Sequence, residues 1–332
     1  MSRPIADQAQ LARGVRFWQL RRVREAALGY AFLTPALALL IAFEFFPIFY
    51  GLYISSCDWR LGCVKSLGLG NYTRALEDPA TWQALGTTAT YALISVPLQL
   101  GLALLIAYLL FQKIKGLGAL RVMYFMPYIT STVASAAVWS YLYSPDKGLV
   151  NAALKLVGLK PERWLAEPLG VFGVFARDYL GGTTLPAWAQ GPSLALVSLI
   201  VYTTWVFVGY DAAIFLAGLG NIPNELYDAA KVDGASGWRL FRHITFPLLS
   251  PTTFFLLILT VIGTFRAFNH IYVMTQGGPG TATTTASILI FQQMYQYNRY
   301  GYSAALSFIL FAAILVLTIV QNTVAGRRVH YD

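Results

Sequence analysis

Six long apolar stretches constrain this chain more than any other feature. Each could cross about 30 Å of hydrocarbon as a helix, which takes about 20 residues. Helices are required because a lipid-exposed backbone must pair its own N–H and C=O groups. Hydrophobic residues make up 57% of the sequence and charged residues only 12%. The predicted fold class is an all-α polytopic membrane protein with crossings near 27–55, 85–111, 119–143, 194–217, 248–272 and 303–325.

The positions of Lys and Arg predict which side of the membrane each connection occupies. Cytoplasmic segments carry an excess of these residues near the ends of the crossings. Such residues gather before the first crossing, between the second and third, and after the last: Arg16, Arg21, Arg22, Arg24, Lys113, Lys115, Arg121, Arg327 and Arg328. We therefore expect cytoplasmic tails at 1–26 and 326–332, around a six-crossing domain at 27–325.

Two features are expected on the outer side. The connection at about 144–193 contains a run, 165–180, that is too short and too interrupted to cross, so it is predicted to be a packed loop or an interfacial helix. Cys57 and Cys63 follow the first crossing and either form a disulfide or are two unrelated small side chains. A metal site there is disfavoured because no third Cys or His is near.

The residues required for covalent chemistry are missing. The sequence has no Gly-x-x-x-x-Gly-Lys-Ser/Thr phosphate loop. His243, His270 and His330 are scattered without the spacing of a metal site or a catalytic triad, and are expected to be polar residues at the membrane edge. No basic helix stands apart from the membrane boundaries, which argues against nucleic-acid binding. We therefore predict no catalytic residues, no metal and no enzymatic activity.

A polar segment rich in small residues separates the fourth and fifth apolar stretches, at about 220–247. Small side chains would allow the backbone of another protein to come close. Asp233-Gly234 predicts the end of a short helix, and Pro247 predicts the end of a second one. Ile222, Leu226, Trp238 and Phe241 are expected to fasten these helices, while Asp228 and Asp233 face a partner. The segment is therefore predicted to be a cytoplasmic docking surface.

This segment resembles the coupling motif of binding-protein-dependent ABC importer permeases: Glu-Ala-Ala, three residues, Gly, nine residues, Ile, two residues, Pro. The chain has Asp228-Ala229-Ala230, Gly234, Ile244 and Pro247 at those spacings, with Asp in place of the first Glu. Residues 70–79 and 268–279 resemble the carbohydrate-importer branch, although that branch often has Asp where Asn269 stands. The resemblance extends from about residue 28 to the end.

The resemblance implies a type I importer permease in a bacterial-type cytoplasmic (inner) membrane, with both termini cytoplasmic. It would form half of a translocation pathway with a second homologous permease and work by alternating access. An ABC ATPase dimer would hold ATP and Mg, this chain would bind no cofactor, and an extracytoplasmic binding protein would deliver a sugar. A di- or oligosaccharide is favoured, and a polyol phosphate stays open. The implied ATPase-coupling residues are Asp228, Ala229, Ala230, Asp233, Gly234, Phe241, Ile244 and Pro247.

Ionisable residues inside the crossings are candidates for the substrate pathway, because burying them is costly. Arg266 is expected toward the outer half of the fifth crossing, and Glu44 at a similar depth, so the two are hypothesised to pair. Asp211 is expected lower, near the cytoplasmic boundary, as a partner of the coupling region and apart from Arg266.

Asn269, Tyr272 and Gln276 follow Arg266 on roughly one helical face. This face either lines the sugar cavity or packs on the partner permease or another crossing. The rival function is a stand-alone channel or secondary transporter, although paired broken crossings and repeated halves are not visible. A membrane enzyme comes third because no catalytic cluster is present.

Overall fold

The computed structural model describes residues 5–60, 62–111 and 116–326, and the side chains of the first helix from Arg21 onward. Lys113, Lys115, Arg327, Arg328 and His330 therefore lie outside the described residues, as does the side chain of Arg16.

Within the described residues, four helical segments are long and apolar enough to cross a membrane: Arg21–Ser55, Pro79–Phe111, Leu194–Gly220 and Tyr300–Val324. A fifth crossing results if Trp238–Leu248 and Ser250–Phe265, which meet at a 64° bend, are joined. The predicted class, a helical polytopic membrane protein, is confirmed.

Two predicted crossings are interrupted. The third corresponds to two shorter helices, α5 (Leu117–Ile129) and α6 (Thr132–Leu142). The fifth does not continue to residue 272, because α13 (Ser250–Phe265) ends and α14 (Asn269–Thr275) starts as a new helix.

The remaining elements follow in chain order. They are α1 (Ile5–Leu40), η1 (Ile41–Phe45), α2 (Phe46–Ser55), β1 (Cys57–Trp59), β2 (Cys63–Ser66), α3 (Gly70–Glu77), α4 (Pro79–Phe111), α7 (Leu149–Leu156), α8 (Val171–Tyr179), η2 (Ala187–Ala189), α9 (Leu194–Gly220), α10 (Asn224–Val232), α11 (Trp238–Leu240), η3 (Phe241–Thr245), α12 (Phe246–Leu248), α15 (Ala286–Phe291), η4 (Gln292–Gln296) and α16 (Tyr300–Val324).

The core of the bundle lies between α4, α9, α13 and α16, where apolar side chains such as Ala103, Phe215 and Leu256 form one buried cluster. Small residues let these helices approach closely. A Cβ on Gly209 of α9 would lie 1.8 Å from the backbone oxygen of Tyr124, so only glycine allows α5 to pack there.

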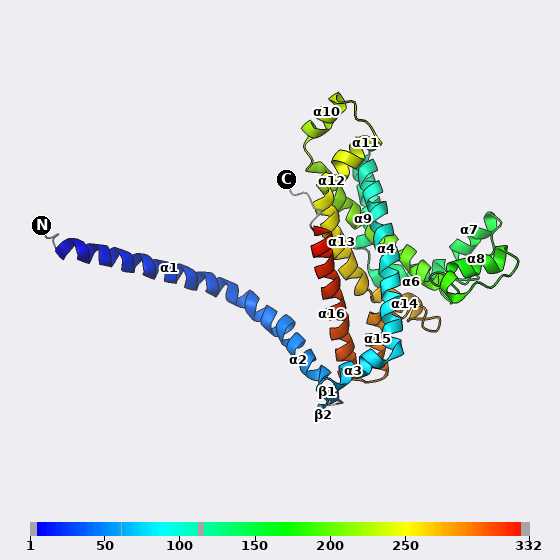
Figure 1. Cartoon of the computed structure of the whole chain (residues 1–332), viewed down its shortest axis with the longest axis horizontal. Coiled ribbons are helices and arrows are strands. Elements are labelled where there is room, and N and C mark those ends of the chain that lie inside the picture. The colour runs from blue at the N-terminus through cyan, green and yellow to red at the C-terminus, as the bar shows by residue number, and fades with distance from the viewer. Residues whose placement is uncertain (1–4, 61, 112–115, 327–332) are drawn as a thin grey trace.

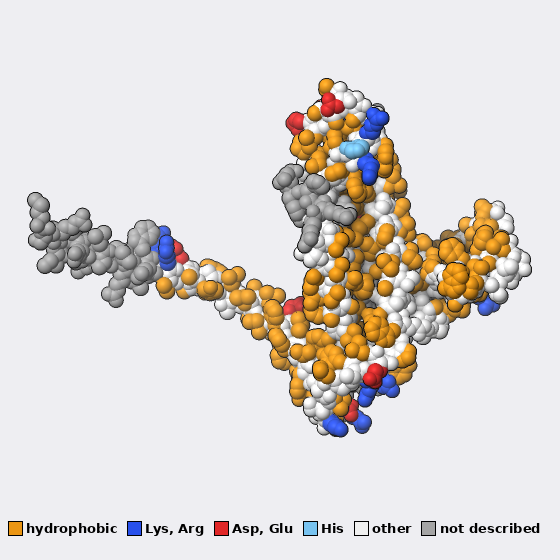
Figure 2. Space-filling model, viewed as in Figure 1, with side chains coloured by type: hydrophobic (Ala, Val, Ile, Leu, Met, Phe, Trp, Pro, Cys, Tyr) orange, Lys and Arg blue, Asp and Glu red, His pale blue; other side chains and the backbone are white. Residues whose placement is uncertain are grey.

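The first helix leaves this bundle as a long arm (Figure 1). The apolar part of Arg21–Ser55 is 0% buried, and its surface is largely apolar (Figure 2). Among the described residues of this helix, those of α2 pack on the bundle, against α16. An apolar helix with no contacts along most of its length requires lipid or another protein chain around it.

The bundle has two distinct ends (Figure 1). We call the end with α10, α11 and η3 the coupling end, and the end with the antiparallel β1–β2 hairpin and α3 the hairpin end. Helix α4 joins them over roughly 50 Å at about 1.5 Å per residue. The segment 144–193, with α7 and α8, projects sideways, and we call it the lobe.

Candidate functional site

A cavity of about 380 Å³ lies inside the bundle. Its walls come from α4, α5, α6, α9, α13 and the start of α14. The side chains are mixed, with aromatic rings, hydroxyls and a few charged or amide groups: Tyr91, Gln99, Tyr128, Thr132, Thr203, Phe207, Tyr210, Asp211, Leu259, Thr260, Thr264, Arg266, Phe268, Asn269 and His270. Concave sites with a few placed polar groups are typical of small-molecule binding.

Asp211 and Gln99 lie side by side in the wall of this cavity. Both are 3% exposed, and Nε2 of Gln99 donates a hydrogen bond to Oδ2 of Asp211. Arg266 lines the same cavity but forms no ion pair with Asp211 among the described contacts. As expected, the two side chains do not pair, but Asp211 bonds to Gln99 of α4 inside the bundle and not to the coupling region, so its expected partner was wrong. A buried amide on α4 draws the carboxylate into the bundle.

Two more polar groups meet at His270, which is buried. Its Nε2 lies 2.9 Å from the Tyr91 hydroxyl and 3.1 Å from Oγ1 of Thr203, and these two hydroxyls are also hydrogen-bonded to each other. The prediction that His270 sits at the membrane edge was wrong. The triad joins α4, α9 and α14 because each polar group would otherwise be buried without a partner.

Aromatic rings cover another wall of the cavity. Tyr128 of α5 stacks on Tyr210 of α9, with ring centroids 4.4 Å apart, and meets Phe207 edge-on at 5.9 Å. Ring faces are broad apolar surfaces. The cavity can therefore offer hydrogen bonds from one side and apolar contact from another.

The predicted helical face from Arg266 to Gln276 is divided. Arg266 and Asn269 line the cavity, but Tyr272 and Gln276 do not. The helix is interrupted between Phe265, where α13 ends, and Asn269, where α14 starts, so these positions do not share one helix. Tyr272 instead stacks on Phe268 at 5.4 Å. The prediction that these residues share one helical face was wrong, and the two alternatives divide between them: Arg266 and Asn269 line the cavity, whereas Tyr272 packs within the bundle.

Glu44 does not meet Arg266. It lies exposed on η1, on the arm that leaves the bundle, and no ion pair joins the two residues among the described side chains. The hypothesised pair was therefore wrong. Similar depth did not bring the two residues together because the first helix does not pack beside α13.

The predicted docking segment forms an exposed helix and a tight turn at the coupling end. Helix α10 carries Asp228, Ala229 and Ala230, and the turn follows at Asp233-Gly234. Gly234 has φ +77°, a left-handed conformation that favours glycine. Its N–H donates to the carbonyl of Lys231 at 3.0 Å, which closes the helix end.

The segment is fastened at few points. Ile222 is buried, and Phe241 packs edge-on against Tyr108 of α4 at 5.2 Å. Leu226 and Trp238 were predicted to act likewise; they stay 42% and 71% exposed, but the Trp238 ring stacks on Phe241 at 5.2 Å. Ile244 and Pro247 are half-buried on η3 and α12. A further contact was missed from the sequence: the hydroxyl of Tyr227 on α10 lies 3.0 Å from Oγ1 of Thr245 on η3.

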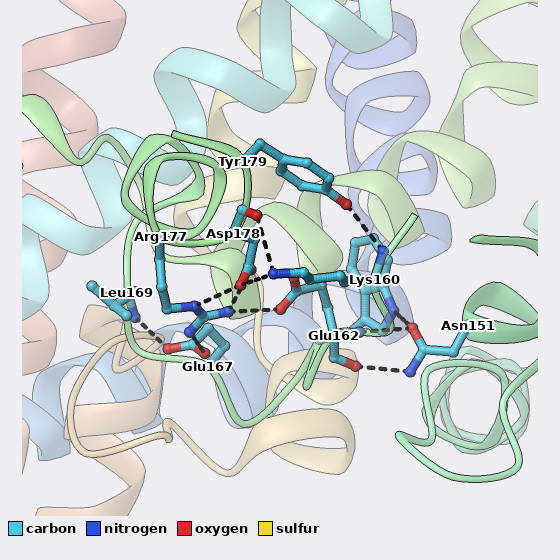
Figure 3. A network of polar contacts seen from close by, with 9 residues as sticks. Asn151, Lys160, Glu162, Glu167, Leu169, Arg177, Asp178 and Tyr179 are labelled. Carbon is cyan, nitrogen blue, oxygen red and sulfur yellow. Dashed lines mark hydrogen bonds and ion pairs between the residues drawn. The ribbon is translucent and has the colours of Figure 1, made fainter. Parts of the chain in front are cut away.

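The lobe is held by a network of charged groups (Figure 3). Arg177 donates from Nη1 to Glu167 at 2.8 Å, and from Nη2 to Glu162 at 3.0 Å and to Asp178 at 2.9 Å. The Nζ atom of Lys160 lies 3.7 Å from Oδ1 of Asp178. Burial, followed by the neighbouring Asp178, raises the pKa of Glu162 to about 7, while the hydrogen bond from Arg177 lowers the pKa of Asp178.

At the hairpin end, Cys57 and Cys63 are joined by a disulfide. The side chain of Asn71 donates to the carbonyls of Ser55 and Cys57, both at 2.9 Å. The hairpin is thus anchored both to itself and to α3.

A family model described as binding-protein-dependent transport system inner membrane component matches residues 79–330. The chain is 34% identical over 309 residues to the trehalose/maltose transport system permease of Thermococcus litoralis, with 92% of this chain and 96% of the relative covered. It is 32% identical over 304 residues to the lactose transport system permease of Rhizobium radiobacter, covering 90% and 94%.

A third relative is the sn-glycerol-3-phosphate transport system permease of Agrobacterium fabrum, 32% identical over 307 residues, covering 92% and 96%. Among solved structures, a chain of a bacterial alginate ABC transporter in complex with an alginate pentasaccharide-bound periplasmic protein has the same fold. Its TM-score is 0.76, with 21% identity and with 92% and 96% of the two chains covered.

Proposed function

The chain belongs to the binding-protein-dependent transport system inner membrane components, and on this premise we propose that it carries a neutral di- or oligosaccharide across the membrane. It is a multi-pass inner-membrane permease subunit of an ABC importer and not an enzyme. ATP and Mg would be held by a separate ATPase dimer. The proposal extends to the cargo, the partner chains and the cytoplasmic position of both termini.

The cavity between α4, α9 and α13 carries the proposal on cargo. Its volume of about 380 Å³ lies within the range of small-molecule pockets, ~300–1,000 Å³. Asp211 and Asn269 can accept hydrogen bonds from sugar hydroxyls, Arg266 can donate, and the Tyr128–Tyr210 pair offers a ring face. The named cargoes of the trehalose/maltose and lactose relatives support a disaccharide.

A phosphorylated cargo fits this cavity less well. The glycerol-phosphate relative keeps that possibility open, and Arg266 would favour an anion. The buried Asp211 carboxylate faces the same space. A cargo anion there would meet a like charge in a poorly solvated site, which is costly. Neutral hydroxyl groups carry no such penalty.

Two surfaces support the proposed partners. The exposed α10 helix and the Gly234 turn match the family's coupling motif, and we assign them to the ATPase dimer. The uncovered apolar arm at Arg21–Ser55 fits a second, homologous permease. An extracytoplasmic binding protein would approach from the hairpin end. ATPase closure would then move α10 and rock the crossings, opening the cavity alternately to each side.

Uptake by the whole transporter tests the cargo. The permease pair, its ATPase and its binding protein would be reconstituted in proteoliposomes and supplied with ATP and labelled trehalose, maltose, lactose or glycerol phosphate. We expect uptake of a disaccharide, and an Asp211→Asn variant should reduce it about tenfold or more. Glu44→Gln is the matched control, because it also neutralises a carboxylate in a crossing but lies outside the cavity.

Three results would overturn the proposal. One is uptake of glycerol phosphate alone. Another is an Asp211→Asn variant that transports disaccharide as well as the wild type does. The third is purification of the chain without an ATPase or a second permease, which would favour a stand-alone channel.

A further inference from the structure

A second cavity, of about 590 Å³, lies at the hairpin end, far from the sugar cavity. It is formed by β1 and the residue after it, by α3, and by the turn that precedes α16. Three arginines and four aromatic residues dominate its wall, with a single carboxylate: Arg60, Arg74, Arg299, Trp59, Tyr297, Tyr300, Tyr302 and Asp58. Figure 2 shows basic side chains at this end of the molecule.

The three guanidinium groups have no anionic partner in the part of the chain that the structure describes. None of Arg60, Arg74 and Arg299 belongs to an ion pair there. Arg299 only approaches the ring of Tyr297, at 5.9 Å. Three positive groups that share one hollow repel each other until an anion enters. The planar fork of arginine matches phosphate oxygens in particular.

The walls of this cavity are held in place before any ligand binds. The disulfide closes the hairpin, and the buried Asn71 ties the backbone at Ser55 and Cys57 to α3. On the opposite wall, a Cβ on Gly301 would lie 2.1 Å from the carbonyl oxygen of Cys57, so the start of α16 presses against β1. A preorganised site loses little entropy when it binds.

The position of the cavity favours a lipid as the source of the anion. It is lined by β1 and by the start of α16, the last crossing, and β1 also contacts α2, the end of the first crossing. Trp and Tyr at the ends of crossings mark the headgroup level of a bilayer. We propose that this cavity binds the phosphate of an anionic phospholipid headgroup, and that the lipid stabilises the contact between α2 and α16.

Lipid retention on the purified transporter tests this site. The complex would be placed in nanodiscs of phosphatidylcholine with added phosphatidylglycerol that carries a photo-crosslinking group on its headgroup, and the attached peptides identified by mass spectrometry. We expect attachment to residues 57–60, 74 and 297–300. An Arg74→Gln, Arg299→Gln double variant should reduce it about tenfold. Arg163→Gln, an exposed arginine on the lobe, is the matched control.

A competition arm separates the two sources of phosphate. Excess phosphatidylglycerol without the crosslinker should abolish attachment, whereas inorganic phosphate or sn-glycerol-3-phosphate should not. Attachment elsewhere, equal attachment in the double variant, or full displacement by the soluble anions would overturn the proposal. Sugar uptake is not the readout, so failure here leaves the proposed cargo untouched, and failure of the cargo assignment leaves this site untouched.

Discussion

Gln99 on α4 donates a hydrogen bond to Asp211 on α9, and this contact joins two neighbouring helices inside the cavity. A carboxylate inside a membrane protein is costly to bury, and Asp211 has no cationic partner among the described ion pairs. Residues retained at such a cost are candidates for function, which is why the sugar site is assigned here.

The amide of Gln99 should stabilise the fold through this bond. Gln99→Leu leaves the buried Asp211 without its donor, so we expect the free energy of unfolding to fall by about 1–3 kcal/mol. Asp211→Leu in the Gln99→Leu background should recover much of that loss, because both polar groups are then gone. Thermal unfolding of the purified complex measures the stability of the single and the double variant. Additive losses in the double variant would contradict a direct bond.

The hydroxyl of Tyr91 is hydrogen-bonded to both Thr203 and His270. Tyr91→Phe keeps the ring but removes that hydroxyl, so we expect a loss of about 1–2 kcal/mol in unfolding free energy. Tyr141→Phe on α6 is the control, since its hydroxyl is exposed and makes no hydrogen bond within the described residues. Equal melting temperatures for the two variants would argue against the triad.

The helices of this fold were largely predictable, but the breaks within them were not. Continuous apolar stretches gave the crossings at α4, α9 and α16, because a membrane leaves helices as the only solution for such sequences. The interruptions at Thr130-Ser131 and at 266–268 lie inside apolar stretches. At the first one, the hydroxyl of Tyr202 on α9 donates a hydrogen bond to the carbonyl of Thr132 at 2.9 Å, which is a contact with another helix. A hydropathy profile contains no information about such contacts between helices.

The rotation of each helix about its axis also escaped prediction. Helix α9 is apolar almost all round, so no stripe of polar residues indicates which side faces the cavity. Tyr210 and Asp211 therefore gave no sign that they would meet Tyr128 and Gln99. Gln99 itself offered a signal, as an amide in an otherwise apolar stretch. The turn at Gly234 was predictable because local backbone chemistry fixes it.

The lobe should respond to pH through Glu162, whose pKa is raised to about 7. That value lies above about 4.3, the value for an unfolded chain. The stabilising contribution of Glu162 is thus complete below pH ~4.3 and is lost as the pH rises through ~7. Asp178 behaves oppositely: its pKa is lowered, so its contribution is present above ~3.9 and is lost as the pH falls through its folded value.

Amide hydrogen exchange in residues 144–193, corrected for the intrinsic effect of pH, measures this behaviour. We expect protection to fall between about pH 5 and about pH 8. Glu162→Gln, which cannot ionise, should flatten the change, whereas Glu77→Gln on the exposed side of α3 should leave it intact. A pH response that survives in Glu162→Gln would assign the effect to another group.

Gly234 should control how ATP hydrolysis is linked to transport, because it shapes the turn that follows α10. Its φ of +77° costs an alanine about 1–2 kcal/mol, yet a Cβ there would meet no atom within 4 Å. Gly234→Ala therefore changes the backbone of the docking surface without disturbing the bundle. We expect normal amounts in the membrane, but fewer sugar molecules imported per ATP hydrolysed. Gly234→Trp adds bulk to the same surface and should uncouple the two activities further.

Gly220→Ala is the matched control, since that glycine also faces open space but has ordinary helical geometry. Simultaneous measurement of ATPase activity and uptake in proteoliposomes gives the ratio. Wild-type coupling in Gly234→Trp would mean that the ATPase docks elsewhere.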